Sequence, residues 1–423
     1  MRSYQNYKST GVQWLGSVPT HWKKIRFKDI LKVKDSRVGK RKDLTLLSLT
    51  KKGVIVRDLS DGKGKFPKDY EAYKIVHPND FILCLFDVDE TPRTVGIAKH
   101  EGMITGAYDV FDIVGANREY IYYLYLSFDD AKSLKPLYKG LRKTIPLPSL
   151  RSSYLFLPTI DEQVAITDYI KSEVNKIDHL ISETEKEISL LNELKQAEIA
   201  RMVTSGLNPN VQMKDSGITW IGKIPAHWQI THLRKYLKLL SDKGHGEERL
   251  LSVTREQGVI VRNVESKEEN HNFVPDDLNG YKLVNKGQFA INKMKSWQGS
   301  YGVSPYRGIV SPAYYVCDLK FDNKEYFNIA IRSKAYIPFF TQYSKGIRVD
   351  QWDLSPIALK QIPFIEPPKE EQEQIVKAIK NSNSKIEKLT AQLAKQISYL
   401  QELKQRVISD AVTGKIDVRN YNN

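Results

Sequence analysis

The chain contains the same succession of short motifs twice, in the same order. Gly11-Val-Gln-Trp-Leu-Gly-Ser-Val-Pro-Thr-His-Trp22 returns as Gly217-Ile-Thr-Trp-Ile-Gly-Lys-Ile-Pro-Ala-His-Trp228, 206 residues later. A tandem duplication of this kind predicts two similar modules related by an approximate rotation, so any binding surface occurs twice. The further pairs of matching segments are 53–57 with 258–262, 102–108 with 308–314, 139–142 with 345–348, and 161–163 with 370–372.

Length and charge agree with two modules and an anionic partner. A chain of 423 residues is too long for one ordinary core. The net charge of +15 is concentrated in residues 1–150 and 206–365, whereas residues 151–205 are acidic. Basic blocks predict an anion partner there, although a generally basic solvated surface would have the same composition.

Cysteine usage and hydropathy indicate a cytoplasmic protein. Cys84 and Cys317 each lie in an apolar run far apart in the chain, which favours two buried free thiols over a disulfide or metal site. No apolar run approaches the roughly 18 residues that span a bilayer. The first residues have neither the apolar core nor the cleavage site of a signal peptide.

Each half begins with a strand-rich domain. Short apolar runs broken by Gly, Pro, Asn and Asp are typical of short strands in a compact mixed domain. Residues 120–129 and 325–332 are expected to form short helices inside these domains. The expected strands are Leu44–Thr50, Val54–Arg57, Asp80–Phe86, Met103–Val114, Leu250–Thr254, Val259–Arg262, Gln288–Asn292 and Ile309–Cys317.

One long helix follows each domain. Both helices start after a proline, with carboxylates in the first turn that suit the helix dipole, and neither contains an internal Pro or Gly. Apolar residues then alternate at spacings of three and four over about five heptads, which predicts a coiled-coil seam about 60 Å long. Two helices of matched length are expected to pack antiparallel as a rigid spacer, with the chain ends close together. The seam residues expected to hold this coiled coil and its partners are Ile170, Val174, Ile177, Ile181, Ile188, Leu191, Ile379, Ile386, Leu389, Leu393, Leu400 and Leu403.

Motifs for catalysis are missing from the sequence. Residues 61–65 lack the spacing of a phosphate-binding loop, and no glycine-rich strand–turn–helix unit offers a nucleotide site. The eight histidines have no metal-ligand spacing. His21 and His227 each precede a Trp, and this repeat favours a turn whose indole anchors the N-terminal arm over a reactive pair. The sequence therefore predicts a binding protein.

Polar turns in both basic domains supply the side chains that contact phosphates and base edges in DNA. Residues 36–42 and 61–65 are basic loops, and residues 292–299 mix cations, amides and an aromatic ring. Residues 86–94, the counterpart of the last turn, are acidic, so the two domains are not expected to read alike. For any single side chain, a solvated surface residue is the equally simple interpretation. The candidates are Arg37, Lys40, Arg41, Lys42, Lys51, Lys52, Arg57, Lys63, Lys65, Arg93, Arg142, Arg255, Arg262, Lys293, Lys295, Trp297, Gln298 and Arg348.

The repeated Gly-x-x-Trp-[Leu/Ile]-Gly-x-[Val/Ile]-Pro-x-His-Trp motif and the paired Glu-Gln helix starts resemble the specificity subunits of type I restriction–modification systems. The resemblance covers essentially the whole chain. It implies an α+β fold with two similar mixed α/β target-recognition domains, 1–155 and 213–365. Two long helices, 160–205 and 370–412, would separate them as an antiparallel coiled coil in a pseudo-two-fold, circular arrangement.

The same resemblance implies a chain that binds and assembles without catalysing. Each recognition domain would read one half of a split site in double-stranded DNA, and the helices would dock methyltransferase subunits, expected to number two. Restriction subunits would join them, and S-adenosylmethionine, ATP and Mg²⁺ would be used by those other subunits. A structured-RNA binder or an architectural DNA binder without a methyltransferase partner is the main alternative. A self-sufficient methyltransferase or nuclease is a second alternative, and the missing cofactor and metal motifs argue against it.

Overall fold

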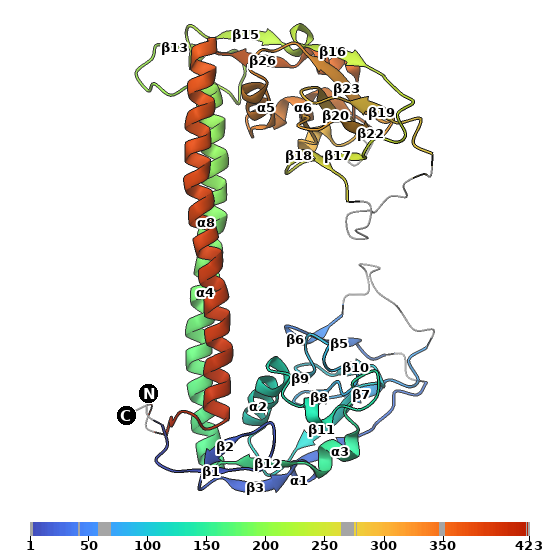
Figure 1. The fold of residues 1–423 in the computed structure, drawn as a ribbon, viewed down its shortest axis with the longest axis vertical. Coiled ribbons are helices and arrows are strands. Elements are labelled where there is room, and N and C mark those ends of the chain that lie inside the picture. Colours follow the sequence, from blue (N-terminus) through green and yellow to red (C-terminus); the bar gives the residue numbers. More distant parts are fainter. Residues whose placement is uncertain are drawn as a thin grey trace. The chain divides into compact units, whose positions relative to one another are not determined.

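The computed structural model describes residues 3–40, 43–57, 69–263, 275, 277–346, 352–419 and 421. The chain folds as two compact units, Met1–Glu185 with Lys395–Asn423 (unit 1) and Lys186–Ala394 (unit 2). Each unit combines one strand-rich domain with one half of each of two long helices (Figure 1).

The domain of unit 1 is organised around a four-stranded antiparallel sheet in the order β4-β11-β8-β9. Alternate residues of its central strands face opposite sides, as the strand period of two requires. Phe81, Leu83 and Phe111 pack in one core with a helix, α2, whereas Ile82 and Val110 pack in a second core. The sheet strands and α2 are β4 (Leu31–Lys34), β8 (Phe81–Leu83), β9 (Val95–Ile97), β11 (Asp109–Ile113) and α2 (Arg118–Asp130).

Four strand pairs and three short helices complete the described part of this domain. The strand pairs are β1 (Tyr7–Ser9) with β2 (Ser17–Pro19), β3 (Lys23–Arg26) with β12 (Tyr154–Leu157), β5 (Leu47–Thr50) with β6 (Gly53–Val56), and β7 (Lys74–Val76) with β10 (Gly102–Ile104). The short helices are α1 (Phe27–Ile30), η1 (Lys135–Leu137) and α3 (Leu147–Ser152).

The domain of unit 2 repeats this topology, with the sheet order β16-β23-β20-β21. The sheet strands are β16 (Leu237–Leu240), β20 (Phe289–Asn292), β21 (Tyr301–Val303) and β23 (Tyr314–Leu319). The strand pairs are β13 (Met213–Asp215) with β14 (Lys223–Pro225), β15 (Gln229–His232) with β26 (Pro363–Glu366), β17 (Leu251–Thr254) with β18 (Gly258–Val261), β19 (Lys282–Val284) with β22 (Gly308–Val310), and β24 (Ser344–Lys345) with β25 (Asp353–Leu354). The helices are η2 (Leu233–Lys235), η3 (Ser296–Gln298), α5 (Lys324–Arg332), α6 (Ile337–Tyr343) and α7 (Pro356–Gln361).

The repeated strand order confirms the predicted α+β fold class and the duplication. Every run predicted as a strand contains one or two strands, and the two expected short helices are α2 and α5. The strands that sequence reasoning missed are short, with three residues in β7 and β9 and four in β4 and β16. A run of three residues is too short to display a period of two.

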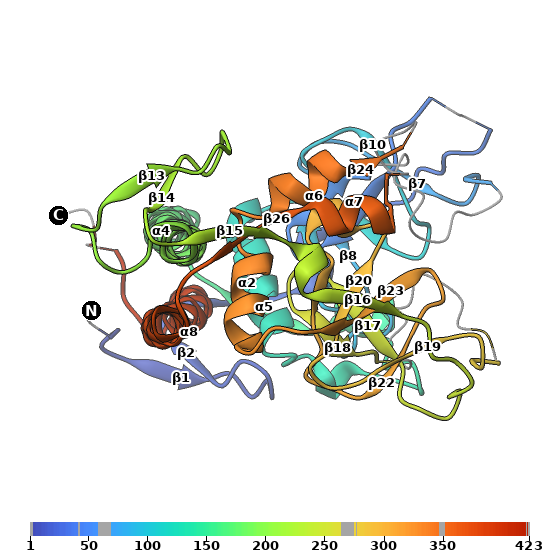
Figure 2. The same ribbon diagram turned by 90° about the horizontal axis from the view of Figure 1, so that it is seen from above.

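The two long helices are α4 (Ile160–Ser205) and α8 (Lys369–Val412). Within each unit, half of α4 lies beside half of α8 (Figures 1 and 2). Lys404 Nζ contacts Asp178 at 2.7 Å in unit 1, and Lys195 Nζ contacts Glu387 at 2.6 Å in unit 2. The partner of Glu198, further along α4, is Ser382, which comes earlier in α8, so the helices are antiparallel.

Burial along the helices follows the predicted seam with two exceptions. Ile170, Ile177, Ile379, Ile386 and Leu393 are buried, and Ile170 and Ile379 belong to the domain cores of their own units. Val174, Ile181, Ile188, Leu191 and Leu400 are half-buried. Leu389 and Leu403 are instead exposed at 39% and 46%. A two-helix pair buries only a narrow stripe of each helix, and these two side chains lie outside it.

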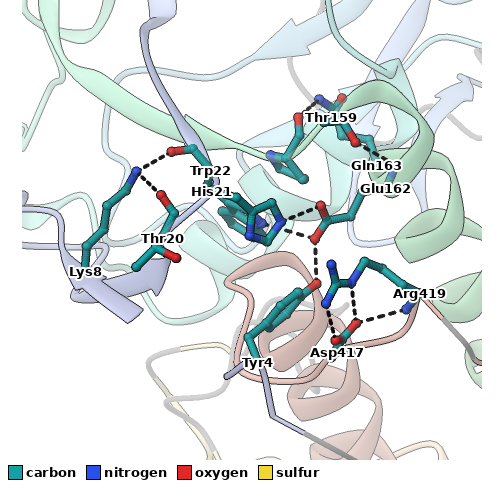
Figure 3. Close-up of polar contacts among 11 residues, drawn as sticks. Tyr4, Lys8, Thr20, His21, Trp22, Thr159, Glu162, Gln163, Asp417 and Arg419 are labelled. Carbon is teal, nitrogen blue, oxygen red and sulfur yellow. Dashed lines mark hydrogen bonds and ion pairs between the residues drawn. The ribbon is translucent and has the colours of Figure 1, made fainter. Parts of the chain in front are cut away.

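A buried glutamate at the start of α4 connects that helix to the N-terminal arm of unit 1. The indole N–H of Trp22 donates to Glu162 at 3.2 Å and the Tyr4 hydroxyl donates at 2.7 Å (Figure 3). His21 Nε2 lies 2.8 Å from the second carboxylate oxygen. The side-chain amide of Gln163 donates to the Pro158 carbonyl at 2.9 Å.

Unit 2 contains the same arrangement at the start of α8. The Trp228 indole donates to Glu371 at 2.9 Å, His227 Nε2 lies 2.5 Å from the same carboxylate, and Gln372 donates to the Pro367 carbonyl at 2.9 Å. The predicted turn with an anchoring indole is therefore confirmed in both copies. The Glu-Gln pairs that mark the helix starts are structural parts of these two joints.

The two chain ends meet in unit 1. The Tyr7 hydroxyl donates to the Gly414 carbonyl at 3.0 Å, and the Arg419 guanidinium lies 5.0 Å from the Tyr4 ring centre. Arg419 is held in turn by Asp417 (Figure 3). The expectation that the ends lie close together is confirmed.

Two further predictions concern the interior and the membrane. Cys84 and Cys317 are free and buried, as expected. Among the described residues, no helix is long and apolar enough to cross a membrane.

Candidate nucleic-acid interface

A row of rings and cations crosses the domain of unit 1 near the ends of β6, β7, β8 and β11. We name it the aromatic row of unit 1 and define it as Arg57, Tyr73, Tyr108, Phe86 and Arg142. Phe86 and Tyr108 stack with centroids 5.9 Å apart, and the Arg142 guanidinium lies 5.4 Å from the Phe86 ring. The row brings together residues from five separate stretches of the chain.

The electrostatics of the row show how close its members are. Burial raises the pKa of Tyr73, and the neighbouring Arg57 guanidinium partly opposes that rise. Burial also raises the pKa of Tyr108, to which Cys84 and Tyr73 contribute as neighbours. Both phenols therefore stay neutral at physiological pH and offer flat rings and hydroxyl groups to a ligand. Stacking surfaces beside arginines are a common means of nucleic-acid binding.

An equivalent row occurs in unit 2 and is defined as Arg262, Tyr281, Tyr314, Asn292 and Lys293. Burial raises the pKa of Tyr314, Arg262 opposes the rise and Tyr281 adds to it. The Tyr314 hydroxyl accepts a hydrogen bond from Asn292 Nδ2 at 3.1 Å. Tyr73 and Tyr281 directly precede β7 and β19, whereas Tyr108 directly precedes β11 and Tyr314 is the first residue of β23. The duplication has thus preserved the middle of the row.

The field around the unit 2 row is positive. Lys282 Nζ donates to the Tyr314 carbonyl at 2.7 Å. Burial lowers the pKa of Lys282, and the nearby cations Lys243 and Lys293 lower it further. Several ammonium groups crowded together favour an anion such as a phosphate.

The two rows differ at one end, where each contains an ion pair of opposite polarity. In unit 1 the loop after β8, residues 84–94, supplies Asp87, which bonds Arg142 at 2.6 Å. In unit 2 the loop after β20 supplies Lys293, which bonds Asp353 at 2.8 Å. The sequence predicted that these two loops would recognise different DNA sequences, and that prediction is based on their opposite charges.

Four further candidates lie on exposed turns of unit 1. Lys51 and Lys52 form the turn between β5 and β6, and Lys40 is exposed on the loop before β5. Arg37 donates to the Ala72 carbonyl at 2.9 Å and pairs with Asp35 at 3.0 Å. All four remain accessible, and the contacts of Arg37 with described residues hold its guanidinium in position.

Arg93 is better explained as a structural residue. Its side chain is 17% exposed and bonds Asp129 at 3.1 Å and Asp130 at 2.9 Å, at the end of α2. Both bonds use Nη1, and most of the side chain is enclosed by its own domain. A DNA contact by Arg93 stays a prediction.

Three candidates of unit 2 line a cavity away from the aromatic row. Arg255, Trp297 and Gln298 border it together with residues of α4, α5 and α8. Trp297 also packs against Trp352 with centroids 5.5 Å apart. Lys295 is exposed at the start of η3. The remaining candidates, Arg41, Lys42, Lys63, Lys65 and Arg348, lie outside the described residues.

Sequence reasoning missed the aromatic members of both rows and the acid that orients Arg142. Tyr73, Tyr108 and Phe86 are far apart in the chain, and only the pairings of β7 with β10 and β8 with β11 bring them together. The repeated Ala-Tyr in residues 107–108 and 313–314 was the available signal.

Comparisons with known proteins agree with this architecture. No protein-family model matches the chain. A protein of Methanocaldococcus jannaschii, named "Putative type I restriction enzyme MjaX specificity subunit", is 23% identical over 442 residues, which cover 98% of this chain and 97% of the relative.

Solved structures extend the comparison to the fold. A chain from a structure on complex assembly and conformational transition of the type I R-M system superposes with a TM-score of 0.58 at 12% identity, covering 94% of this chain and 99% of that chain. The HsdS subunit from Thermoanaerobacter tengcongensis, at 12% identity, covers 96% and 100% with a TM-score of 0.47, too low to carry an argument. The chain is therefore similar in sequence to a type I restriction enzyme specificity subunit along nearly its whole length, and similar in fold to a chain of a type I R-M system.

Proposed function

We propose that the chain is the DNA-specificity subunit of a type I restriction–modification complex and has no catalytic activity of its own. Its domains, 1–155 and 213–365, each bind one half of a bipartite, asymmetric site in double-stranded DNA. The observation that carries this proposal is the pair of equivalent aromatic rows, which share a tyrosine pair and an arginine but end in ion pairs of opposite polarity. Two similar surfaces with different ends suit two different half-sites.

Charge and chemistry support DNA as the ligand. The net charge of +15 is concentrated in the two domains, and cations beside stackable rings suit a phosphate backbone with accessible bases. Bacterial and archaeal DNA lies in the cytoplasm, so we expect the chain to act there.

The long helices are the proposed docking surface for methyltransferase subunits. Several large apolar side chains are exposed on them, although apolar patches on soluble monomers are usually small. Restriction subunits would join the same assembly, and S-adenosylmethionine, ATP and Mg²⁺ would be bound by those partner subunits. The exposed side chains are Leu180, Leu190 and Leu194 on α4 and Leu389, Tyr399 and Leu403 on α8.

Methylome sequencing of a host carrying this chain and a cognate methyltransferase subunit tests the proposal. The expected result is a split, asymmetric adenine-methylation motif that disappears when this chain alone is deleted. A motif that persists in the deletion strain would contradict the proposal. If the wild-type complex binds structured RNA and no split duplex, the alternative RNA-binding reading replaces it.

Two variants test the division of labour between domains and helices. Replacing residues 1–155 with the corresponding domain of another specificity subunit should change one half-site only. Removing four residues from the seam of each long helix shortens it by about 6 Å and should alter the spacer while leaving both half-sites intact. A domain replacement that changes both half-sites would contradict modular recognition.

A further inference from the structure

Arg142, at the end of the aromatic row of unit 1, is held by a two-point contact. Its Nε donates to Asp87 Oδ1 at 3.2 Å and its Nη2 donates to Asp87 Oδ2 at 2.6 Å. The Phe86 ring lies 5.4 Å from the guanidinium. The carboxylate fixes the plane of the guanidinium and the ring supports its position, so the free rotation of an ordinary surface arginine is lost.

The N–H groups of Arg142 that do not bond Asp87 have the arrangement needed to donate two hydrogen bonds to one guanine. A guanidinium has five N–H donors, and Asp87 accepts from two of them along the Nε–Nη2 edge. One N–H each on Nη1 and Nη2 form a second parallel fork at the far end. Among the described residues, Nη1 has no acceptor. Guanine presents O6 and N7 in the major groove, which match such a fork.

The backbone around Asp87 and Arg142 holds the ion pair at an exposed loop tip. The amide N–H of Asp87 donates to the Arg142 carbonyl at 2.9 Å, and Asp87 adopts a positive φ of 47°. Lys143, the next residue after Arg142, has a φ of 44°. Non-glycine residues in this region are uncommon and gather at functional sites. Leu141, just before Arg142, is fully exposed at 103%, so the loop tip points into solvent.

Stability does not account for the pair. Arg142 keeps 71% of its side chain exposed, and ion pairs this exposed contribute little to folding. The contacts that the fold requires, such as those of Glu162 and Glu371, occur in both units with the same polarity. The Asp87–Arg142 pair does not, because unit 2 carries a lysine on the corresponding loop.

We propose that Arg142, oriented by Asp87, donates two hydrogen bonds to a guanine in the major groove and so fixes one G·C pair of the half-site bound by unit 1. Arg142 is the base-contacting residue and Asp87 is a positioning residue. This inference rests on the proposed function, since it requires that unit 1 bind duplex DNA. A phosphate contact by Arg142 is the competing role, and the experiments below separate the two.

Methylome sequencing of substituted full-length chains, each with its methyltransferase subunit, is the first experiment. Arg142→Ala and Arg142→Lys should make one G·C position degenerate in one half-site, because a lysine is a point charge without the planar fork. Asp87→Ala should relax the same position more weakly. Asp89→Ala is the matched control, since it breaks the neighbouring Lys143–Asp89 pair at 2.6 Å and should leave the motif unchanged.

Binding of the purified complex to duplexes with 7-deazaguanine at that position is the second experiment. Wild type should lose roughly 5- to 150-fold in affinity when guanine N7 is missing, whereas Arg142→Ala should be insensitive to the substitution. Asp87→Ala should bind the unmodified duplex roughly 2- to 10-fold more weakly, because its arginine must be ordered on binding. Unchanged melting temperatures in all four variants would exclude a folding defect.

Several outcomes would overturn the inference. One is a motif that keeps every position strict in Arg142→Ala, or whose half-sites contain no G·C pair. Another is a uniform fall in methylation at all sites with the motif intact, which would assign Arg142 to a phosphate. If the wild-type complex produced no split motif and bound no split duplex, the proposed function itself would be wrong.

Discussion

Replacing Glu162 with alanine should loosen the joint of unit 1 far more than the equivalent change, Glu371→Ala, loosens that of unit 2. Glu162 is 5% exposed and accepts buried hydrogen bonds from the Tyr4 hydroxyl and the Trp22 indole. The Glu371 side chain is 34% exposed, and its contacts with Trp228 and His227 are partly or fully open to solvent.

The loss of stability in each variant depends on whether the donors that lose the carboxylate can bond to water instead. A buried donor left without a partner costs about 1–3 kcal/mol, and Glu162→Ala leaves two. Removing the buried charge offsets part of this loss, since its desolvation cost also disappears. We expect about 3 kcal/mol for Glu162→Ala and about 1 kcal/mol for Glu371→Ala, which leaves one buried donor, the Trp228 indole, and an exposed His227. Glu162→Gln keeps an acceptor oxygen in place and should cost about 1 kcal/mol.

Hydrogen exchange read by mass spectrometry measures both joints in one molecule. The amides of β1–β3 report on unit 1 and those of β13–β15 report on unit 2. A difference of about 2 kcal/mol corresponds to roughly a 30-fold difference in the opening constant. If Glu371→Ala increased exchange in unit 2 as much as Glu162→Ala does in unit 1, the number of buried donors left without an acceptor would not determine the loss of stability.

Three further expectations follow from burial and backbone geometry. Cys84 and Cys317 should resist iodoacetamide at pH 8 until the chain unfolds, because burial raises the pKa of both thiols and that of Cys317 to about 12; rapid labelling of the folded chain, read by mass spectrometry, would contradict this. Gly414→Ala should lower the urea midpoint more than Gly206→Ala: both have positive φ, but the new Cβ of the first would lie 2.6 Å from a proline ring and that of the second 3.1 Å from an indole. We expect about 2–4 kcal/mol against about 1–2 kcal/mol, and equal midpoints would refute the steric argument. Leu141→Ala should leave the melting temperature unchanged, since a fully exposed side chain loses no buried area; a drop of several degrees would mean that the loop tip packs against the domain.

The features predicted well are those with long or repeated signals. Five heptads without Pro or Gly allow little besides a long helix, and α4 and α8 are continuous over 46 and 44 residues. The His-Trp and Glu-Gln motifs lie about 140 residues apart, and their repetition predicted a turn at one and a helix start at the other, but not their contact through Glu162. Duplication supplied what a single copy could not, because chance patterns do not recur in the same order.

The features predicted poorly depend on long-range pairing. In the sequence, Arg93 looks like any surface cation, and only the fold brings it to Asp129 and Asp130 on α2. Tyr73 and Tyr108 lie on different turns, and the strand register that makes them neighbours is not visible in any local window. Apolar periodicity also placed Leu389 and Leu403 in the helix–helix seam, although both are exposed. The spacing alone does not distinguish side chains that face the other helix from those at the edge of the contact.

The duplication also separates what the fold needs from what a ligand can select. Contacts made in the same way in both units, such as an indole donating to a glutamate in the first turn of a long helix, must hold whatever sequence is recognised. The ion pairs at the ends of the two rows carry an aspartate on the loop after β8 in unit 1 and a lysine on the loop after β20 in unit 2. Arg348, which corresponds to Arg142 in the repeat, lies outside the described residues. If the fold required this ion pair, both copies would carry the same charge on the loop. Recognition of two different bases imposes no such requirement. Exchanging the polarity in unit 1, with Asp87→Lys and Arg142→Asp together, should therefore preserve folding and change the sequence read by that unit alone.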